Sequence, residues 1–325
     1  MGRRATTAPP HSYRSRAPLI PHPRLHSAHI RESSFMKNRQ GRLALLFLLP
    51  YLLIFSLFRF VPSIGGLVVS LFDWSLGGNP KMIGADNYKR LAKDPAFLTS
   101  VKNTFMFFIL TVPVLVVVSL LLAVLVNQKL RGRNAVRAIS IIPYVLIPAI
   151  VGIMWNWLYD NNFGLLNYYL RQIHLDPVFW LTDEKVALVA VSLVVMWTYL
   201  GYDMILFLAG LQGVSSQLYE AASIDGASRW QTFRYVTLPL LKPVTMMVTT
   251  LTLVNVVQLF DQIYVMTNGG PGTSTLTMVQ YMYTSAFNNY ELGYGSAIEV
   301  VILVMLMVLI VLQNRIGNRR KAKKT

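Results

Sequence analysis

Six long apolar stretches limit what this chain of 325 residues can fold into. They span residues 43–71, 103–126, 138–159, 186–211, 244–266 and 295–312. A helix needs about 20 apolar residues to cross about 30 Å of hydrocarbon. Because lipid offers the backbone no hydrogen-bond partners, stretches of this kind must be helical. The sequence therefore predicts an all-α polytopic membrane protein with six transmembrane helices.

The composition agrees with a membrane location. Only 14% of the residues are charged, whereas a soluble domain carries about 25%. The net charge of +16 would also fit a nucleic-acid partner. However, the basic residues cluster at the ends of the apolar stretches, an arrangement that orients membrane helices. We therefore expect contact with membrane lipid and no nucleic-acid partner. The absence of cysteine excludes disulfides and thiol catalysis.

Lys and Arg are distributed unevenly over the loops. With the N-terminus inside, the cytoplasmic segments hold 22 of them, namely 9, 4, 3 and 6 in residues 1–42, 127–138, 212–242 and 313–325. The external segments hold 6, namely 4, 2 and 0 in residues 73–100, 159–185 and 267–294. This asymmetry predicts that both termini lie in the cytoplasm.

The first 35 residues differ from the rest of the chain. They contain four of the five histidines, six arginines and five prolines, without periodicity or a long apolar run. We expect a disordered basic tail. Alternatively the start is mis-assigned, because Met36 opens a basic segment directly before the first apolar stretch. Residues 36–325 are then a single transmembrane domain.

A polar loop, residues 212–242, separates the fourth and fifth stretches on the predicted cytoplasmic side. It contains Glu220-Ala221-Ala222, then Gly226 after three residues, then an aliphatic residue two positions before Leu238-Pro239. We expect a short helix over residues 217–225, ended by Gly226 in the left-handed conformation. Ser228 is expected to cap a second helix over residues 229–236, with Pro239 beyond its end.

Two short helices at an angle would form a rigid knob that fits a groove on another protein. The small side chains of Ala221 and Ala222 would allow such a partner to approach closely. The alternative interpretation of the same loop is an ordinary amphipathic connection between two membrane spans.

The motif and its spacing resemble the coupling loop of bacterial ABC importer permeases, with Val236 where the family usually has Ile. The resemblance extends from about Met36 to Asn314. It is carried by Asn87-Tyr88, Asp94-Pro95, Asn103-Thr104, Ile142-Pro143, Gly210-Leu211-Gln212, residues 260–264, residues 267–272 and residues 293–297. The last two segments are typical of the carbohydrate branch, and they resemble the first permease of the maltose and glycerol-3-phosphate systems.

This resemblance implies a subunit of the bacterial plasma membrane that forms a heterodimer with a second permease. It also implies two ATP-binding subunits on the cytoplasmic face and an extracytoplasmic solute-binding protein. The residues implied to contact the ATPase are Glu220, Ala221, Ala222, Asp225, Gly226, Arg229, Leu238 and Pro239. The chain contains no Gly-x-x-x-x-Gly-Lys-[Ser/Thr] motif, so we expect no enzyme activity and no cofactor of its own. ATP hydrolysis would then take place in a partner subunit.

Polar residues within the apolar stretches are further candidates, because a polar group in lipid is costly. Asn255, Gln258, Asp261 and Gln262 would share one arc of about 120° on a continuous helix. They either line a sugar path or form hydrogen bonds to the partner permease. Near the outer end, Asp261 would alternatively order the external Gly-Gly-Pro loop.

In the fourth stretch, Trp197 and Tyr202 are candidates for stacking on a sugar, although aromatic residues in membranes often serve as anchors. The sequence assigns no role to Arg59, Asp203 or Glu299.

Two other function classes fit less well. A secondary active transporter would need broken helices, mid-membrane carboxylates and usually an internal repeat, and no convincing repeat is present. A membrane enzyme would need a catalytic or metal-binding cluster, yet His174 is the only histidine after residue 35 and no such motif occurs. We expect no metal site. Because Arg59 is the only basic residue inside the stretches and Lys102 borders the second, a neutral sugar is favoured over glycerol-3-phosphate or another polar non-sugar solute.

Overall fold

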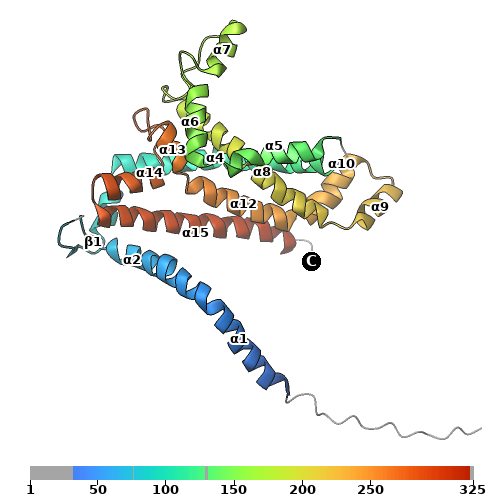
Figure 1. The fold of residues 1–325 in the computed structure, drawn as a ribbon, viewed down its shortest axis with the longest axis horizontal. Coiled ribbons are helices and arrows are strands. Elements are labelled where there is room, and N and C mark those ends of the chain that lie inside the picture. Colours follow the sequence, from blue (N-terminus) through green and yellow to red (C-terminus); the bar gives the residue numbers. More distant parts are fainter. Residues whose placement is uncertain (1–31, 76, 129–130, 323–325) are drawn as a thin grey trace, which may run out of the picture. The chain divides into compact units, whose positions relative to one another are not determined.

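The computed structural model describes residues 32–75, 77–128 and 131–322, and most of them lie in helices (Figure 1). The first helix begins at Glu32, so most of the segment expected to be a disordered tail or a mis-assigned start lies outside the described residues. The elements are α1 Glu32–Phe55, η1 Ser56–Phe60, α2 Val61–Val69, β1 Phe72–Asp73, β2 Lys81–Met82, α3 Asp86–Leu91, α4 Pro95–Asn127, α5 Arg133–Val145, α6 Pro148–Leu158, α7 Leu165–Gln172, α8 Ala187–Gln212, α9 Ser216–Ile224, α10 Arg229–Thr232, η2 Phe233–Thr237, α11 Leu238–Leu240, α12 Lys242–Val257, α13 Asp261–Met266, α14 Met278–Tyr283, η3 Thr284–Asn288 and α15 Leu292–Ala322. The η elements are π-helical turns, and β1 and β2 pair antiparallel.

The prediction of an all-α membrane protein is confirmed. Within the described ranges, five helical segments are long and apolar enough to cross a membrane: Leu43–Val69, Pro95–Asn127, Ala187–Gln212, Lys242–Met266 and Leu292–Gly317. The pair α5 and α6 makes a sixth crossing if its two helices form one span. The predicted number of six crossings is therefore reached only if α5 and α6 form one span.

By its internal contacts the chain forms two units, one ending at Phe60 and the other beginning at Val61. The first holds α1 and η1, and every side chain from residue 43 to residue 60 is exposed. A helix that is apolar on all sides is expected to be covered by lipid or by another protein chain. The π-helical turn η1 contains Arg59 and directly precedes α2, which contains Pro62, so the backbone departs from regular α geometry there.

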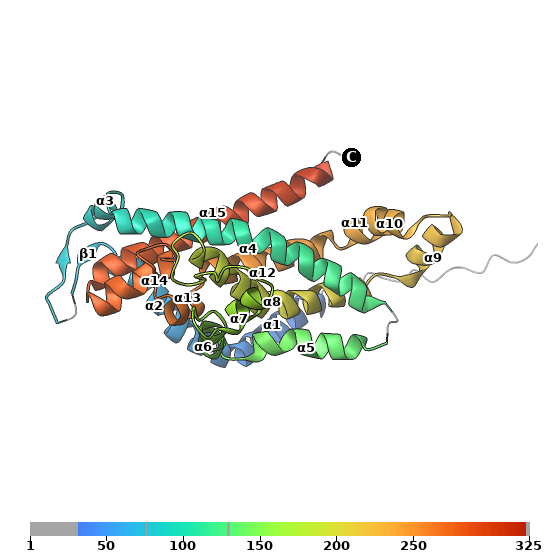
Figure 2. The same ribbon diagram turned by 90° about the horizontal axis from the view of Figure 1, so that it is seen from above.

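In the second unit, α4 and α8 pack along each other and α12 contacts both (Figures 1 and 2). Helix α5 packs on α8, and α15 packs on α12 and on α2. Lipid provides no hydrophobic driving force between helices, so close approach of backbones at small residues matters most. Gly201 of α8 is such a residue, because a side chain there would collide with the backbone carbonyl of Ser140 on α5.

The third predicted span is not one straight helix. Helices α5 and α6 are bent by 100° at Leu146 and Ile147, whose backbones are extended. Pro148 is the first residue of α6. Proline disfavours the helical conformation of the residue before it and lacks an amide hydrogen, so the helix ends and restarts in a new direction.

The fifth predicted span is also interrupted. Helix α12 ends at Val257 and α13 begins at Asp261, with Phe260 outside the helical region at φ −131° and ψ −59°. The Thr277 hydroxyl donates a hydrogen bond to the carbonyl of Leu259 at 3.2 Å. A side chain from a later element therefore satisfies a backbone group that the break releases, as helix breaks in membranes require.

Polar residues tie together the end of the second unit that carries β1, α3 and α14. Asn87 donates to the carbonyls of Ser70 and Phe72, at 2.8 and 2.9 Å. Asn103 donates to the carbonyls of Thr273 and Leu276, at 2.7 and 3.1 Å. These amide side chains hold loops that are far apart in the sequence.

Asp94 is the centre of a second set of contacts at this end. Its carboxylate caps α4 through the amides of Ala96 and Phe97 and accepts hydrogen bonds from the hydroxyls of Tyr281 and Tyr294, each at 2.5 Å. Burial favours the neutral acid, but these hydrogen bonds outweigh it and hold the pKa of Asp94 below its ordinary value. In turn, burial and the hydrogen bond to Asp94 raise the pKa of Tyr281 to about 12.

Next to it, Arg90 pairs with both carboxylate oxygens of Glu291, at 3.1 and 2.9 Å. The Arg90 guanidinium also lies 3.9 Å from the centre of the Tyr294 ring. Contacts of this type link α3 to α15, which is one of the three helices that the Asp94 carboxylate joins.

The lowered pKa of Asp94 makes stability depend on pH. Since the folded pKa lies below the unfolded value of about 3.9, the stabilisation is complete above that value and is lost as pH falls through the folded pKa. We expect Asp94→Asn to lower the thermal midpoint at neutral pH, and the gap to wild type to shrink as the pH falls below about 3.9. Thermal unfolding in detergent would measure this, and a gap that stays constant would contradict it.

Candidate coupling loop and solute path

The polar loop between α8 and α12 folds as a pair of short helices. Helix α9 covers Ser216–Ile224 and ends at Gly226, whose φ is +75°. The amide of Ala227 donates to the carbonyl of Ala222 at 2.9 Å and that of Gly226 to Ser223 at 3.1 Å. This is the Schellman arrangement that glycine permits at a helix end. The predicted first helix and its left-handed glycine are confirmed.

The second helix begins where the sequence predicted. Ser228 Oγ accepts from the Gln231 amide at 3.3 Å, while Gln231 Oε1 accepts from the Ser228 amide at 2.7 Å. This reciprocal pair is a capping box. A hydrogen bond of 3.4 Å between the hydroxyls of Thr237 and Tyr219 ties the second segment to α9. The two segments are therefore held against each other.

One detail of the predicted loop is wrong. Pro239 does not lie beyond the second helix, since α10 continues through η2 into α11 and Pro239 occupies the first turn of α11. Proline fits a first helical turn because its fixed φ suits the helix and its missing amide hydrogen is not needed there.

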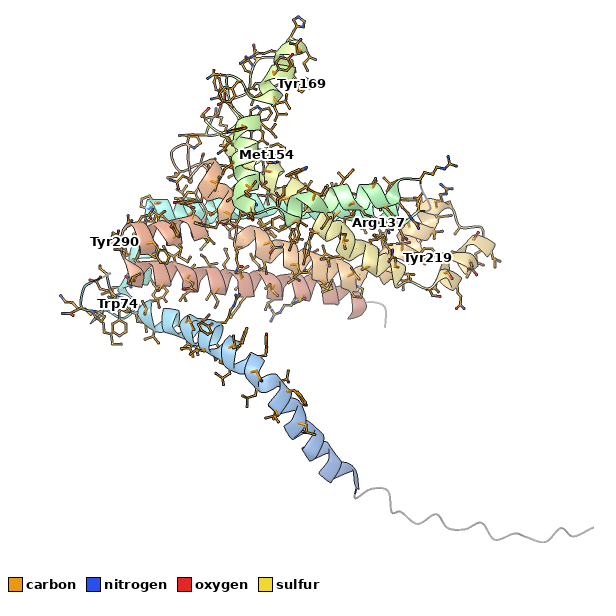
Figure 3. The ribbon with its side chains drawn as sticks, viewed as in Figure 1. Trp74, Arg137, Met154, Tyr169, Tyr219 and Tyr290 are labelled. Carbon is orange, nitrogen blue, oxygen red and sulfur yellow. The ribbon has the colours of Figure 1, made fainter. Side chains whose placement is uncertain are left out.

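The implied ATPase-contacting residues are mostly accessible. Glu220, Ala221, Asp225, Gly226, Arg229 and Pro239 are exposed, and Ala222 and Leu238 are half-buried. Tyr219 marks the loop at the opposite end of the second unit from Trp74 and Tyr290 (Figure 3). The end of α15 lies on the loop's side, because Gln313 donates to the carbonyl of Met246 at 2.9 Å, near the start of α12.

Three large side chains of this loop were not predicted as site residues. Ile224, Trp230 and Tyr235 are 87%, 69% and 74% exposed. Apolar residues inside a polar loop were the signal that could have found them. Exposed apolar groups on a rigid polar knob are typical of a surface that another protein covers.

The predicted path residues do not form a single stripe. On the broken fifth span, Gln258 and Asp261 are exposed and Asn255 is half-buried, while Gln262 is buried. The expected arc depended on one continuous helix, and the break between α12 and α13 turns Gln262 into the protein interior.

Aromatic rings gather beside these polar residues. Tyr202 stacks on Tyr144 with ring centres 4.4 Å apart, and Tyr144 also meets Tyr199 edge to face. Trp197 meets Trp155 edge to face at 5.5 Å. Trp197 and Tyr202 thus belong to two separate aromatic clusters between α8 and the broken pair α5–α6. No local pattern pointed to Tyr144, because its partner on α8 is distant along the chain.

Asp203 lies buried between α8 and α12. Its Oδ2 accepts from the Thr252 hydroxyl at 2.7 Å, whereas Oδ1 has no hydrogen-bond partner. The same hydroxyl lies 2.8 Å from the carbonyl of Val248. Asp203 therefore joins two helices.

This contact predicts the result of removing the hydroxyl. Thr252→Val leaves a buried carboxyl group without a partner, which should lower the free energy of unfolding by about 1–3 kcal/mol. The double variant Asp203→Leu/Thr252→Val should recover part of that loss, since no polar group is left unpaired. Thermal midpoints of the solubilised variants would measure both effects. Equal stability of wild type and Thr252→Val would refute this role of the pair.

Comparison with known proteins agrees with the fold. The family model for binding-protein-dependent transport system inner membrane components matches residues 91–322. The trehalose/maltose transport system permease protein MalF of Thermococcus litoralis is 33% identical over 290 residues, 89% of this chain and 98% of the relative. The lactose transport system permease protein LacF of Rhizobium radiobacter is 35% identical over 282 residues, 85% of this chain and 94% of the relative.

A solved structure shares the fold. It is a bacterial ABC transporter involved in the import of the acidic polysaccharide alginate, with a TM-score of 0.76 and 24% identity, covering 88% of this chain and 98% of that chain. The resemblance that the motifs carry is thereby confirmed: the chain belongs to the family of binding-protein-dependent transport system inner membrane components, the membrane-embedded permeases of ABC importers.

Proposed function

We propose that this protein is one of two permease subunits that together carry a sugar across the bacterial plasma membrane. A solute-binding protein delivers the sugar on the outside, and two ATP-binding subunits drive the transport from the cytoplasm. The observation that carries the proposal is the coupling loop, a rigid pair of capped helices with Ile224, Trp230 and Tyr235 exposed. The loop and the end of α15 share one end of the second unit, which supports their common cytoplasmic location.

The two broken spans support a solute path. Non-helical backbone at membrane depth is tolerated where it is buried in protein or lines a water-filled cavity, and transporters place solute sites at such breaks. One break lies at Leu146–Ile147 and the other at Gln258–Phe260. The halves beyond them, α6 and α13, pack against each other. The exposed Gln258 and Asp261 adjoin the second break. We therefore assign Asn255, Gln258 and Asp261 to the path, with Trp197 and Tyr202 as aromatic contacts.

The nature of these groups supports a sugar as the solute. Amide side chains bind hydroxyl groups, and aromatic faces suit the apolar faces of sugar rings. The relatives described above are named for trehalose, maltose and lactose. Broken helices would also suit a secondary active transporter, but that mechanism has no use for an exposed coupling loop.

The coupling loop gives the direct test. In a complex assembled with its partner subunits, Trp230→Ala should lower ATP-driven uptake by about tenfold or more. The reason is that a large aromatic side chain buried by the partner contributes at least about 1.4 kcal/mol to an interface. Uptake into proteoliposomes and copurification of the ATPase would be measured. Phe287→Ala is the matched control, since that ring is 58% exposed at the opposite end. Equal uptake by both variants would argue against the loop as the ATPase contact.

The path residues predict a different defect. Gln258→Leu should leave assembly intact and reduce sugar uptake, because the amide that binds hydroxyls is lost while the exposed position tolerates leucine. Uptake, ATP hydrolysis and subunit stoichiometry would be measured together, with Asn255→Leu as a second variant. If either variant instead loses its partner permease during purification, that residue belongs to the subunit interface.

A further inference from the structure

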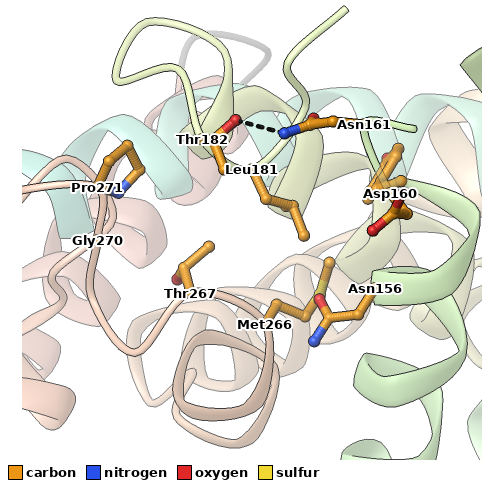
Figure 4. A pocket seen from close by; sticks show the side chains of 10 residues that line it. Asn156, Asp160, Asn161, Leu181, Thr182, Met266, Thr267, Gly270 and Pro271 are labelled. Carbon is orange, nitrogen blue, oxygen red and sulfur yellow. Dashed lines mark hydrogen bonds between the residues drawn. The ribbon is translucent and has the colours of Figure 1, made fainter. Parts of the chain in front are cut away.

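A pocket of 410 Å³ opens between the loop that follows α6 and the loop that follows α13 (Figure 4). Its walls come from Asn156, Tyr159, Asp160, Asn161, Leu181, Thr182, Met266, Thr267, Gly270 and Pro271. It is distinct from the residues already assigned to the path, none of which lines it.

The pocket lies close to the two helix breaks. Helices α6 and α13 are the halves that follow the breaks, and they pack closely where a side chain at Gly152 would lie 3.0 Å from Val265. Asn156 fastens the pair by donating to the carbonyl of Val265 at 3.1 Å. The pocket lies at the far ends of both helices. From Pro148 to Asn156 the helix rises about 12 Å, so the pocket and the first break are a short distance apart along the same helix.

The pocket's polar groups are almost all neutral. Asn156 Oδ1 is a buried oxygen with no hydrogen-bond partner, and such a group is unfavourable unless a ligand or water reaches it. Asn161 Nδ2 and Thr182 Oγ1, 3.0 Å apart, form part of the rim. Hydroxyl and amide groups of this kind both donate and accept hydrogen bonds, as sugar hydroxyls do.

The single charged residue that lines the pocket, Asp160, already accepts hydrogen bonds from the backbone. Asp160 accepts through one carboxylate oxygen from the amides of Asn162 and Phe163, at 2.8 and 3.0 Å. The lining contains no Lys, Arg or His, so nothing in it attracts an anion. Leu181, Met266 and Pro271 add an apolar surface that matches the carbon face of a sugar ring.

We propose that this pocket is an entry subsite, which holds one ring of a neutral sugar after its release from the binding protein and before it reaches the helix breaks. The inference rests on the proposed function and adds a site and a ligand class to it. The sugar's hydroxyls exchange hydrogen bonds with Asn156, Asn161 and Thr182. Its apolar face lies against Leu181 and Met266.

Two rim variants test the subsite without disturbing buried contacts. Thr182→Trp places a bulky ring at the exposed rim to obstruct the pocket, and Asn161→Ala removes a rim amide. Asn289→Ala, at an exposed position outside the pocket, is the matched control for the second variant. The complete complex is reconstituted in proteoliposomes with its binding protein, and maltose, trehalose and lactose are the probes. Uptake and ATP hydrolysis stimulated by the loaded binding protein are measured in parallel.

We expect Thr182→Trp to reduce uptake about tenfold and Asn161→Ala about threefold, since a tenfold change corresponds to about 1.4 kcal/mol. Stimulated ATP hydrolysis should stay within about twofold of wild type, and the concentration of binding protein for half-maximal stimulation should not change. Asn289→Ala should behave as wild type.

Two outcomes would overturn the proposed subsite while leaving the proposed function intact. Unchanged uptake by both rim variants shows that no sugar passes through the pocket. The second outcome is that uptake and stimulated ATP hydrolysis fall together and the concentration of binding protein for half-maximal stimulation rises. This result shows that the pocket receives the binding protein itself. A wild-type complex that hydrolyses ATP but imports none of the three sugars would overturn the proposed function, and the subsite with it.

Discussion

Hydrocarbon offers no hydrogen-bond partner to a peptide group, and the architecture of this protein depends on that constraint. It makes each apolar stretch helical, and it requires that every departure from the helix be compensated by protein or water. The Thr277 hydroxyl provides such compensation at the α12–α13 break by reaching the Leu259 carbonyl. A second break separates α5 from α6 at Leu146 and Ile147. The breaks thus mark where the protein needs a polar or accessible interior.

The two ends of the second unit are stabilised in different ways. At the end with β1 and α14, the contacts join segments distant in the sequence, through Asn87, Asn103 and the carboxylate of Asp94. At the end with the coupling loop, the main contacts are local: the helix end at Gly226 and the capping box at Ser228. A loop whose shape is set by its own residues keeps that shape when the helices around it shift. This property suits the role proposed for the loop, which is to transmit movement from the ATP-binding subunits.

Several findings could not have come from the pattern of residues. The stripe of polar residues on the fifth span assumed one helix, but Gln262 turns inward after the break. Periodicity reports the face of a residue only while the helix continues. Asp203 had no assignable role because its partner, Thr252, is 49 positions away. The pocket beside Asn156 combines loops separated by about a hundred residues, and no local signal connects them.

The sequence by itself determined the all-α membrane class, the approximate spans, the family, and the two helix starts and the glycine end of the coupling loop. All of these follow from local information, namely apolar length, glycine and proline chemistry, and short motifs with fixed spacing. Only the tertiary structure decided where the third and fifth spans break, which polar side chains are accessible, and how Asp94 brings three helices together. These features depend on contacts between distant segments, whose energies no single stretch of the sequence contains.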